Sequence, residues 1–459
     1  MQMVDFLDVY ERALKGPLMN ENDFDMKVFV PAINEVVKAY GIKYDPQNPL
    51  PADDVAADNI YHAAVELLSR VGVYCQGTNR IIKFTKEEIY RAVKAAPGRC
   101  ILGEGKDAGV YGMRKPDDSK WPWFTVGHGW ICTSEEMATN QVEALALLPE
   151  AKAMKFPNLD HIRGIPITAG SPMEIYASIR MINISREAMR RAGRPGMPFM
   201  SLLTTAASAA TTLAASAPQF GLRPTDEWIC GFTAEMRINF GTMNKIAYLL
   251  NWGANIAAES APILGGFCGG PTGTAVVNVA YFLAGLLIQN SNDHLTFPTH
   301  FRYGCTTTKD ILWAVSSACQ ASSRNIPVPV HWSSYLASGS NTKMYYYESA
   351  AYLLCAVTSG SAGTGTAHPF RGVKVDGATP MDAKFGIEMG KAASKLTRDK
   401  ASEIVLRLLE KYEHRIPEPP EGDRYQDCYD AVTGRPGEGC IRKYNEVVEE
   451  LVAMGIPFE

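Results

Sequence analysis

A carboxylate in an apolar setting is the most informative chemical feature of this 459-residue sequence. Glu259 lies within the run AAESAP at 257–262, where a charged side chain needs either a partner or a catalytic task. Glu259 is therefore the first candidate catalytic residue, and Glu227 is the second. The carboxylates Glu235 and Glu348, which lie in predicted helices, are added as candidate substrate-binding groups.

Aromatic residues are concentrated near the predicted ends of strands. Phe199, Trp332 and Tyr335 are candidates for contact with a substrate, together with their neighbours Met200 and Ser333. Several rings at one mouth form a box that attracts a methylated cation through the ring faces. Ordinary core packing is the alternative for any ring taken alone. The pattern indicates a methylated cation as a candidate ligand.

A glycine-rich segment, GGFCGG, forms a second candidate site with Gly265, Gly266, Gly269 and Gly270. It lacks the Lys-Ser/Thr of a nucleotide phosphate loop. Glycine allows the main chain to approach a flat, bulky ligand closely. The segment therefore favours contact with such a ligand over binding of phosphate.

Two histidines have a spacing that suits a shared metal ion. His294 and His300 are six residues apart on a predicted strand and face the same way. No suitable third ligand accompanies them, so a structural or substrate-positioning role is favoured and no metal site is predicted. A metal-dependent barrel hydrolase is kept as an alternative.

The composition argues against several classes of function. A net charge of −4 gives no basic footprint for nucleic acid. The longest apolar stretch, 275–288, is too short to span a bilayer, and the acidic, amphipathic N-terminus does not resemble a secretion signal. The ten cysteines include no CxxC pair and are expected to be reduced and buried. We expect a cytoplasmic protein.

Strands and helices alternate among the elements that must position these residues. Strands are predicted at 99–103, 123–127, 162–168, 197–203, 255–263, 295–303, 328–333 and 367–375. Helices are predicted at 135–154, 173–192, 227–252, 274–290, 308–324, 343–358 and 382–396. About eight such units predict an α/β fold, the TIM (β/α)₈ barrel, whose active sites lie at the carboxyl ends of the strands. A doubly wound open sheet is the rival fold.

Helical segments are predicted to flank the barrel. Residues 1–97 form an N-terminal helical segment packed on the barrel, 98–397 form the catalytic barrel, and 398–459 form a helical tail. Two stretches of small residues are predicted to be loops. The first, 204–218, is a strand-to-helix loop on the active-site face, and the second, 359–366, is a flexible link from a helix to a strand.

Several segments resemble those of the monomethylamine:corrinoid methyltransferases of methanogens. They are AGRPGM at 192–197, GVYC at 72–75, RIIK at 80–83, PILGGF at 262–267 with Gly269 and Gly270, the pattern HLxxPxHxRxG at 294–304, and QDCYD at 426–430. The resemblance covers essentially the whole chain. It implies a TIM barrel that assembles as a homohexamer and binds no cofactor tightly. Such a barrel transfers a methyl group to the cobalamin of a partner corrinoid protein.

The resemblance also implies roles for individual residues. Met200 stands where the family carries its catalytic pyrrolysine, and Glu259 matches the carboxylate beside it. Tyr335 matches a tyrosine of the family pocket, while Ser333 replaces its glutamine. The family has a second active-site glutamate. Glu227 stands at its position if a two-residue insertion follows Glu227; otherwise Ile229 stands there.

Met200 changes the expected chemistry. Pyrrolysine offers an electrophilic imine that captures methylamine, whereas methionine has no electrophile. A quaternary ammonium already carries positive charge and leaves as a neutral amine, so it needs neither covalent capture nor a proton donor. We therefore expect a pyrrolysine-independent methyltransferase that acts on a quaternary amine, or on a methyl ether or methylated heteroatom if Glu259 is a general acid. The alternative is a non-catalytic barrel that binds a small ligand or the corrinoid partner.

Overall fold

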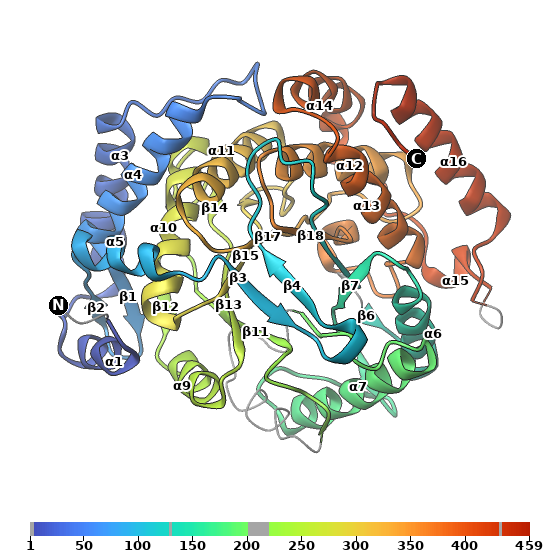
Figure 1. The fold of residues 1–459 in the computed structure, drawn as a ribbon, viewed down its shortest axis with the longest axis horizontal. Helices are drawn as coiled ribbons and strands as arrows, with labels where there is room; N and C mark the ends of the chain where they lie inside the picture. The colour runs from blue at the N-terminus through green and yellow to red at the C-terminus, as the bar shows by residue number, and fades with distance from the viewer. Residues whose placement is uncertain (1–3, 128–130, 201–219, 431–433) are drawn as a thin grey trace.

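The computed structural model describes residues 4–127, 131–200, 220–430 and 434–459, and its centre is a barrel of parallel strands (Figure 1). Seven strands pair side by side in the order β11-β13-β15-β17-β18-β5-β7. Their bounds are β5 (Trp123–Val126), β7 (Ala151–Met154), β11 (Glu227–Gly231), β13 (Asn255–Ser260), β15 (Asp293–Thr296), β17 (Val330–Trp332) and β18 (Gly363–Gly365). The segment 198–200 closes the ring, because Phe199 forms a parallel bridge with Met154 and accepts a 2.9 Å hydrogen bond from the Glu227 N–H.

Helices surround this ring on the outside (Figure 1). They are α6 (Glu135–Ala146), α7 (Pro172–Arg191), α9 (Thr242–Trp252), α10 (Pro271–Gln289), α11 (Lys309–Asn325), α12 (Lys343–Thr358) and α13 (Pro380–Ala393). A closed ring of eight parallel strands surrounded by helices is the (β/α)₈ architecture. The predicted TIM barrel is confirmed, and the open doubly wound sheet is wrong.

The N-terminal segment packs against the outer helices α10 and α11. It contains α1 (Phe6–Lys15), α2 (Glu21–Asp23), the π-helical turn η1 (Phe24–Phe29), α3 (Val30–Ala39), α4 (Asp54–Val71) and α5 (Lys86–Ala95). It is not purely helical. Strands β1 (Val73–Gln76) and β2 (Arg80–Ile82) form a hairpin, and β12 (Arg237–Asn239) pairs with β1 in parallel.

The C-terminal segment continues the outer layer beside α12 with α14 (Arg398–Tyr412), α15 (Tyr425–Cys428) and α16 (Glu438–Ala453). Short paired strands occur in the loops that follow the barrel strands. These pairs are β6 (Ile131–Cys132) with β8 (Asn158–Leu159), β9 (His161–Ile162) with β10 (Ile165–Pro166), and β14 (Ile263–Leu264) with β16 (Thr299–His300).

A hairpin closes the amino end of the barrel. Strands β3 (Arg99–Leu102) and β4 (Gly109–Gly112) cross the centre of the ring in the view of Figure 1. Their side chains Leu102 and Tyr111 form a buried cluster with Trp123 and Met200, separate from the main core. The lower half of the barrel is therefore filled with side chains.

Three predicted strands are corrected by the structure. The run 99–103 lies in the β3–β4 hairpin outside the ring, and 162–168 contains only the short β9–β10 hairpin. The run 367–375 contains no strand, and the last barrel strand is β18. That strand lies within 359–366, which had been predicted to be a flexible link. A Cβ at Gly363 would meet the Tyr111 hydroxyl at 2.6 Å and His331 Nδ1 at 2.8 Å, so close packing requires glycine in this strand.

Two barrel strands had been placed inside predicted helices. The range 135–154 divides into α6 and β7, and 227–252 divides into β11 and α9. The β7 sequence AKAM consists of good helix formers, so pairing with β5 and the 198–200 segment overrides its local propensity. The stretch 204–218 lies outside the described residues.

Within the described part of the chain, one helix is long and apolar enough to cross a membrane. This helix, α10, has 19 residues, with 89% of its apolar window buried inside the protein. It packs against α3, α4, α5 and α11, which makes it a core helix covered on several sides. All ten cysteines are buried and free, as predicted.

Candidate functional site

A cavity of about 540 Å³ opens at the carboxyl end of the barrel. Every strand of the seven-stranded sheet contributes a wall residue, which for β11 lies within the strand and for the others near or beyond the carboxyl end. Those residues include Gly127, Lys155, Phe156, Ile229, Glu259, Leu295, Phe297, Ser333, Tyr335 and His368. Barrel enzymes place their chemistry at this end, so the cavity is the candidate active site.

Glu259 lies in the wall of this cavity near the end of β13. Burial raises the pKa of its carboxyl group, and the nearby cations Lys155 and Lys245 oppose that rise. The structure therefore brings the first sequence candidate to the cavity. It also places a cation there that the sequence reasoning missed. Burial lowers the pKa of Lys155 to about 8, against the attraction of Glu259, Glu227 and Asp293.

Two aromatic side chains and a histidine form one side of the cavity, and a third ring, Phe156, lines it from the end of β7. The Tyr335 and His368 rings are stacked 4.0 Å apart with an interplanar angle of 7°, and Phe297 packs against Tyr335 at 4.9 Å. Gly372, with φ of +72°, lets the chain pass close to the Tyr335 ring, because a Cβ there would lie 3.2 Å from it. The Tyr335 ring is thus held by close packing with its neighbours in the cavity wall.

Phe199 supports the aromatic wall without forming part of it. Its ring is fully buried and stacks on Phe156, which lines the cavity, with centroids 4.1 Å apart. The Arg186 guanidinium covers the other side of Phe199 at 4.2 Å. Trp332 is also buried outside the cavity and packs edge-on against Phe282 of α10. Of the three predicted rings, only Tyr335 lines the cavity.

Of the predicted substrate-binding residues Ser333 and Glu348, only Ser333 lines the cavity. Ser333 directly follows β17. Glu348 of α12 is fully buried and accepts hydrogen bonds from the Ala337 N–H at 2.8 Å and from the Ser338 hydroxyl at 2.6 Å. These bonds fix the loop that carries Tyr335, so Glu348 is a positioning residue.

The structure distinguishes the two positions proposed for a second glutamate. Ile229 lines the cavity, whereas Glu227, two residues earlier on β11, does not. Glu227 is completely buried and hydrogen bonds to Asp293, whose pKa is raised by burial, by the charge of Glu227 and by that hydrogen bond. Glu227 therefore belongs to an acidic pair beneath the cavity.

Met200 also lies below the cavity. It is 1% exposed, its main-chain N–H donates to the Met154 carbonyl at 3.0 Å, and the Thr125 hydroxyl lies 3.0 Å from its sulfur. Its side chain packs in the cluster with Tyr111 that fills the amino end of the barrel. Met200 is not among the cavity walls.

Glu235 and the glycine segment form a neighbouring unit at the same end of the barrel. The Ile263 N–H donates to Glu235 at 2.9 Å, and burial raises the pKa of this carboxyl to about 7. The segment 265–270 turns back through a 2.8 Å hydrogen bond from the Gly265 N–H to the Gly269 carbonyl. Gly269 and Gly270 are exposed, and a Cβ on either would meet nothing within 4 Å.

The two histidines considered for a metal are not assembled into a site. Burial lowers the pKa of His294 to about 3, and its ring packs on Phe282. The Nδ1 atom of His300 instead accepts a hydrogen bond from the Arg302 N–H. In the described ranges, no group of three His, Cys, Asp or Glu side chains could hold a metal ion.

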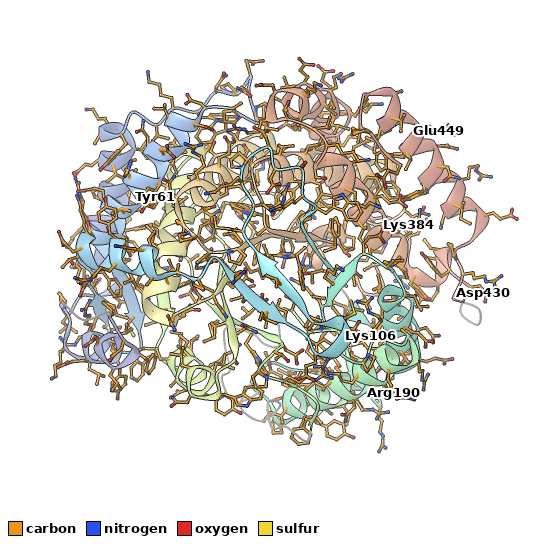
Figure 2. All side chains as sticks on the ribbon, viewed as in Figure 1. Tyr61, Lys106, Arg190, Lys384, Asp430 and Glu449 are labelled. Carbon is orange, nitrogen blue, oxygen red and sulfur yellow. The ribbon has the colours of Figure 1, made fainter. Side chains whose placement is uncertain are left out.

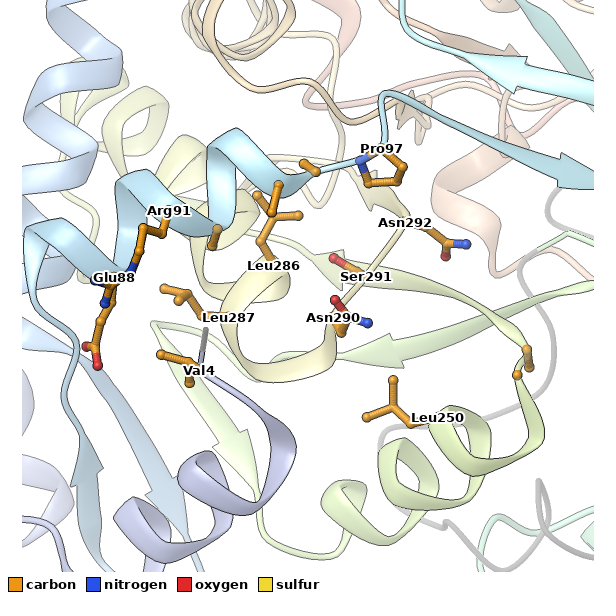
Figure 3. A pocket seen from close by; sticks show the side chains of 15 residues that line it. Val4, Glu88, Arg91, Pro97, Leu250, Leu286, Leu287, Asn290, Ser291 and Asn292 are labelled. Carbon is orange, nitrogen blue, oxygen red and sulfur yellow. The ribbon is translucent and has the colours of Figure 1, made fainter. Parts of the chain in front are cut away.

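A second cavity, of about 340 Å³, lies at the opposite end of the barrel (Figure 3). Its walls come from α5, the end of α10 and the residues 290–292 that lead into β15. The Glu88 carboxylate in its wall is already paired with Arg12 at 2.6 Å. Because it lies at the amino ends of the strands, it is a weaker candidate for chemistry.

The fold and the cavity together define a (β/α)₈-barrel protein with a candidate small-molecule site at the carboxyl face. A family model described as monomethylamine methyltransferase MtmB matches residues 4–456, and the chain belongs to this family. Monomethylamine methyltransferase MtmB2 of Methanosarcina acetivorans is 27% identical over 457 residues, which cover 99% of this chain and 98% of the relative. MtmB1 of Methanosarcina barkeri is 27% identical over 454 residues with the same coverage.

Solved structures agree with the family assignment. The crystal structure of the Methanosarcina barkeri monomethylamine methyltransferase matches with a TM-score of 0.95, 27% identity, and coverage of 100% of this chain and 99% of that chain. The crystal structure of the hydroxylamine MtmB complex gives the same values. The resemblance inferred from the sequence segments is confirmed at the level of family and fold.

Proposed function

We propose that this chain transfers a methyl group from a small quaternary amine to the cobalt of a corrinoid held by a partner protein. Membership of the monomethylamine methyltransferase family supports the methyltransferase class. One observation supports the particular donor. The cavity combines aromatic rings, Tyr335 and Phe297 among them, with the carboxylate of Glu259.

A quaternary ammonium matches the properties of these walls. Ring faces attract a cation that cannot donate hydrogen bonds, and the attraction is worth about 2 kcal/mol when the cation is desolvated. Glu259 balances the charge of the cation, and burial strengthens that interaction relative to water. A primary ammonium would instead require hydrogen-bond acceptors for its own N–H groups.

The reaction needs little acid–base chemistry from the protein. The reduced corrinoid supplies the nucleophilic electron pair, the carbon–nitrogen bond breaks, and a neutral tertiary amine leaves with the bonding electrons. The cavity walls hold the donor and exclude water, so positioning is their main contribution. Met200, which matches the pyrrolysine position by resemblance, is not required to capture the substrate covalently.

The glycine segment is a suitable surface for the approach of the corrin ring. Gly270 has φ of −85°, which any residue can adopt, and a Cβ there would meet nothing inside the protein. Neither backbone strain nor internal packing therefore calls for glycine at this position. Close contact with a flat group outside the protein would explain why glycine occurs at this position.

The test supplies the purified protein with reduced free cobalamin and, separately, tetramethylammonium, choline, trimethylglycine or monomethylamine. We expect methylated cobalamin, detected by its absorbance, with a quaternary donor and not with monomethylamine. Turnover with monomethylamine alone would contradict the proposed donor. Binding of quaternary amines without any turnover would favour the non-catalytic barrel.

A further inference from the structure

Lys155 is the one lysine or arginine among the described residues that line the cavity, and the proposed reaction gives it no task. It directly follows β7, where its main-chain N–H donates to the Val126 carbonyl at 2.8 Å. No ion pair or hydrogen bond joins its Nζ atom to another side chain in the described ranges. A half-buried ammonium without a direct partner is costly unless a ligand supplies one.

Lys155 and Glu259 lie on different walls of the cavity. In the ring, the 198–200 segment and β11 separate β7 from β13. Nevertheless, Glu259 is the charge that most favours the protonated form of Lys155, and Lys155 is the charge that most favours the ionised form of Glu259. Lys155 and Glu259 form no ion pair within 4.0 Å, so a positive and a negative group face the ligand at the same time. The second carboxylate of the lining, Glu174, accepts a hydrogen bond from the Gly170 N–H at 2.6 Å.

The charge of the ligand determines how well it suits these two walls. A simple cation such as choline would occupy the Glu259 side and add a second positive charge beside Lys155. A simple anion would pair with Lys155 and leave Glu259 uncompensated. A molecule with both charges at its two ends pairs with both walls and adds no net charge.

Resting on the proposed function, we infer that the methyl donor is a zwitterion with a methylated cationic nitrogen at one end and a carboxylate at the other. The carboxylate pairs with Lys155 Nζ. The methylated nitrogen lies between the aromatic wall at Tyr335 and the carboxylate of Glu259. Lys155 is therefore a specificity-determining residue that selects carboxylated quaternary amines over uncharged or alcohol-bearing ones.

The pH dependence of binding provides an independent measure of this role. The groups facing Lys155 are the carboxyls of Glu259, Glu227 and Asp293 and the imidazoles of His331 and His368. Burial keeps both imidazoles neutral by lowering their pKa, and it lowers the pKa of Lys155 to about 8. Above that pH the ammonium loses its proton, so zwitterion affinity falls while choline affinity does not.

The experiment measures binding by calorimetry for trimethylglycine, its homologues with two and three carbons between the charges, choline, and 3,3-dimethylbutyrate. The last compound keeps the shape and carboxylate of trimethylglycine but replaces the cationic nitrogen with carbon. We expect one zwitterion to bind at least tenfold more tightly than choline or the carbon analogue. A charge-assisted hydrogen bond to the ligand accounts for a factor of about ten to a hundred.

Variants assign the preference to Lys155. Lys155→Met keeps the length of the side chain and should lose the preference for the zwitterion over choline, whereas Lys155→Arg should retain much of it. Lys384→Met is the matched control, because Lys384 is not among the residues that line the cavity and lies on the outer helix α13 (Figure 2), with its side chain 46% exposed. That variant should bind as the wild type does.

The outcomes distinguish this inference from the proposed reaction. Equal affinity for choline and every zwitterion, or an unchanged preference in Lys155→Met, would overturn the inference even if methyl transfer occurs. Lys155-dependent zwitterion binding without methylated cobalamin would retain the inference and refute the reaction. If Lys155→Met does not fold, the pH dependence of the wild type provides the test. A zwitterion affinity that does not change between pH 7 and 9 would overturn the inference.

Discussion

Replacing Glu259 with glutamine tests the electrostatics of the cavity directly. The change preserves shape and removes one negative charge from the wall. At an effective dielectric of about 20, unit charges roughly 5 Å apart interact by about 3 kcal/mol. Solvent at the mouth reduces this, so we expect a loss of about 1.5–3 kcal/mol, or roughly 10- to 150-fold in the affinity for a quaternary amine.

The same substitution should change Lys155. Glu259 is the leading group that keeps this ammonium protonated, so its removal should lower the pKa of Lys155 below its value of about 8. Calorimetric titration of Glu259→Gln from pH 6 to 9 measures both effects. Glu449→Gln, at an exposed position on α16, is the control. A dissociation constant within threefold of the wild type would refute the assignment of Glu259 to the cation.

Three further substitutions test other parts of the site. Tyr335→Leu should weaken binding of a quaternary amine about tenfold, because it removes the ring face. Tyr335→Phe keeps the ring face and should bind nearly as well as the wild type. If both variants lost the same affinity, the result would argue against a cation–π contact. Gly270→Leu should lower the rate of methyl transfer at least tenfold and leave the substrate affinity and the melting temperature unchanged. An unchanged rate would show that the glycine segment is not part of the surface that the acceptor contacts. Gly363→Val should cost about 1–3 kcal/mol in urea unfolding, because its side chain would collide with Tyr111 and His331; unchanged stability would show that the barrel accommodates it.

The sequence predicts the barrel but not the identity of every strand. Helical periodicity is clear in α6 and α7, because each has one buried face, whereas nearly every residue of α10 and α12 is buried. The strands are harder to recognise. The sequence AKAM favours a helix locally, and the strand containing Gly363 contains two glycines, so only pairing with distant segments determines their conformation.

The site residues found by sequence share one property. Glu259 lies near the end of one segment correctly recognised as a strand, and Tyr335 follows another, so their place at the carboxyl end could be predicted. Lys155 and Phe156 were missed because the strand before them had been assigned to a helix. Trp332 and Phe199 were selected for their rings, but strand alternation turns their side chains away from the cavity.

Glu227 illustrates a limit of matching residues along a sequence. It is a carboxylate on the correct strand, yet Ile229 occupies the cavity position two residues later. A strand presents every second residue to the same side, so both side chains point inward at different depths. The sequence pattern shows which side of the strand a residue occupies. How deep that residue lies in the barrel depends on how the strands are staggered around the ring.

The hairpin β3–β4 has a kinetic consequence. Because Tyr111 and its neighbours fill the amino end of the barrel, the described residues leave the cavity open toward the carboxyl end and closed toward the amino end. In the proposed reaction, donor and demethylated product would use the same face as the methyl acceptor. Turnover should therefore follow a compulsory order in which the donor enters first, and the product departs only after the acceptor has left. The residence time of the acceptor, rather than the rate of bond breaking, would then set an upper limit on the rate of catalysis.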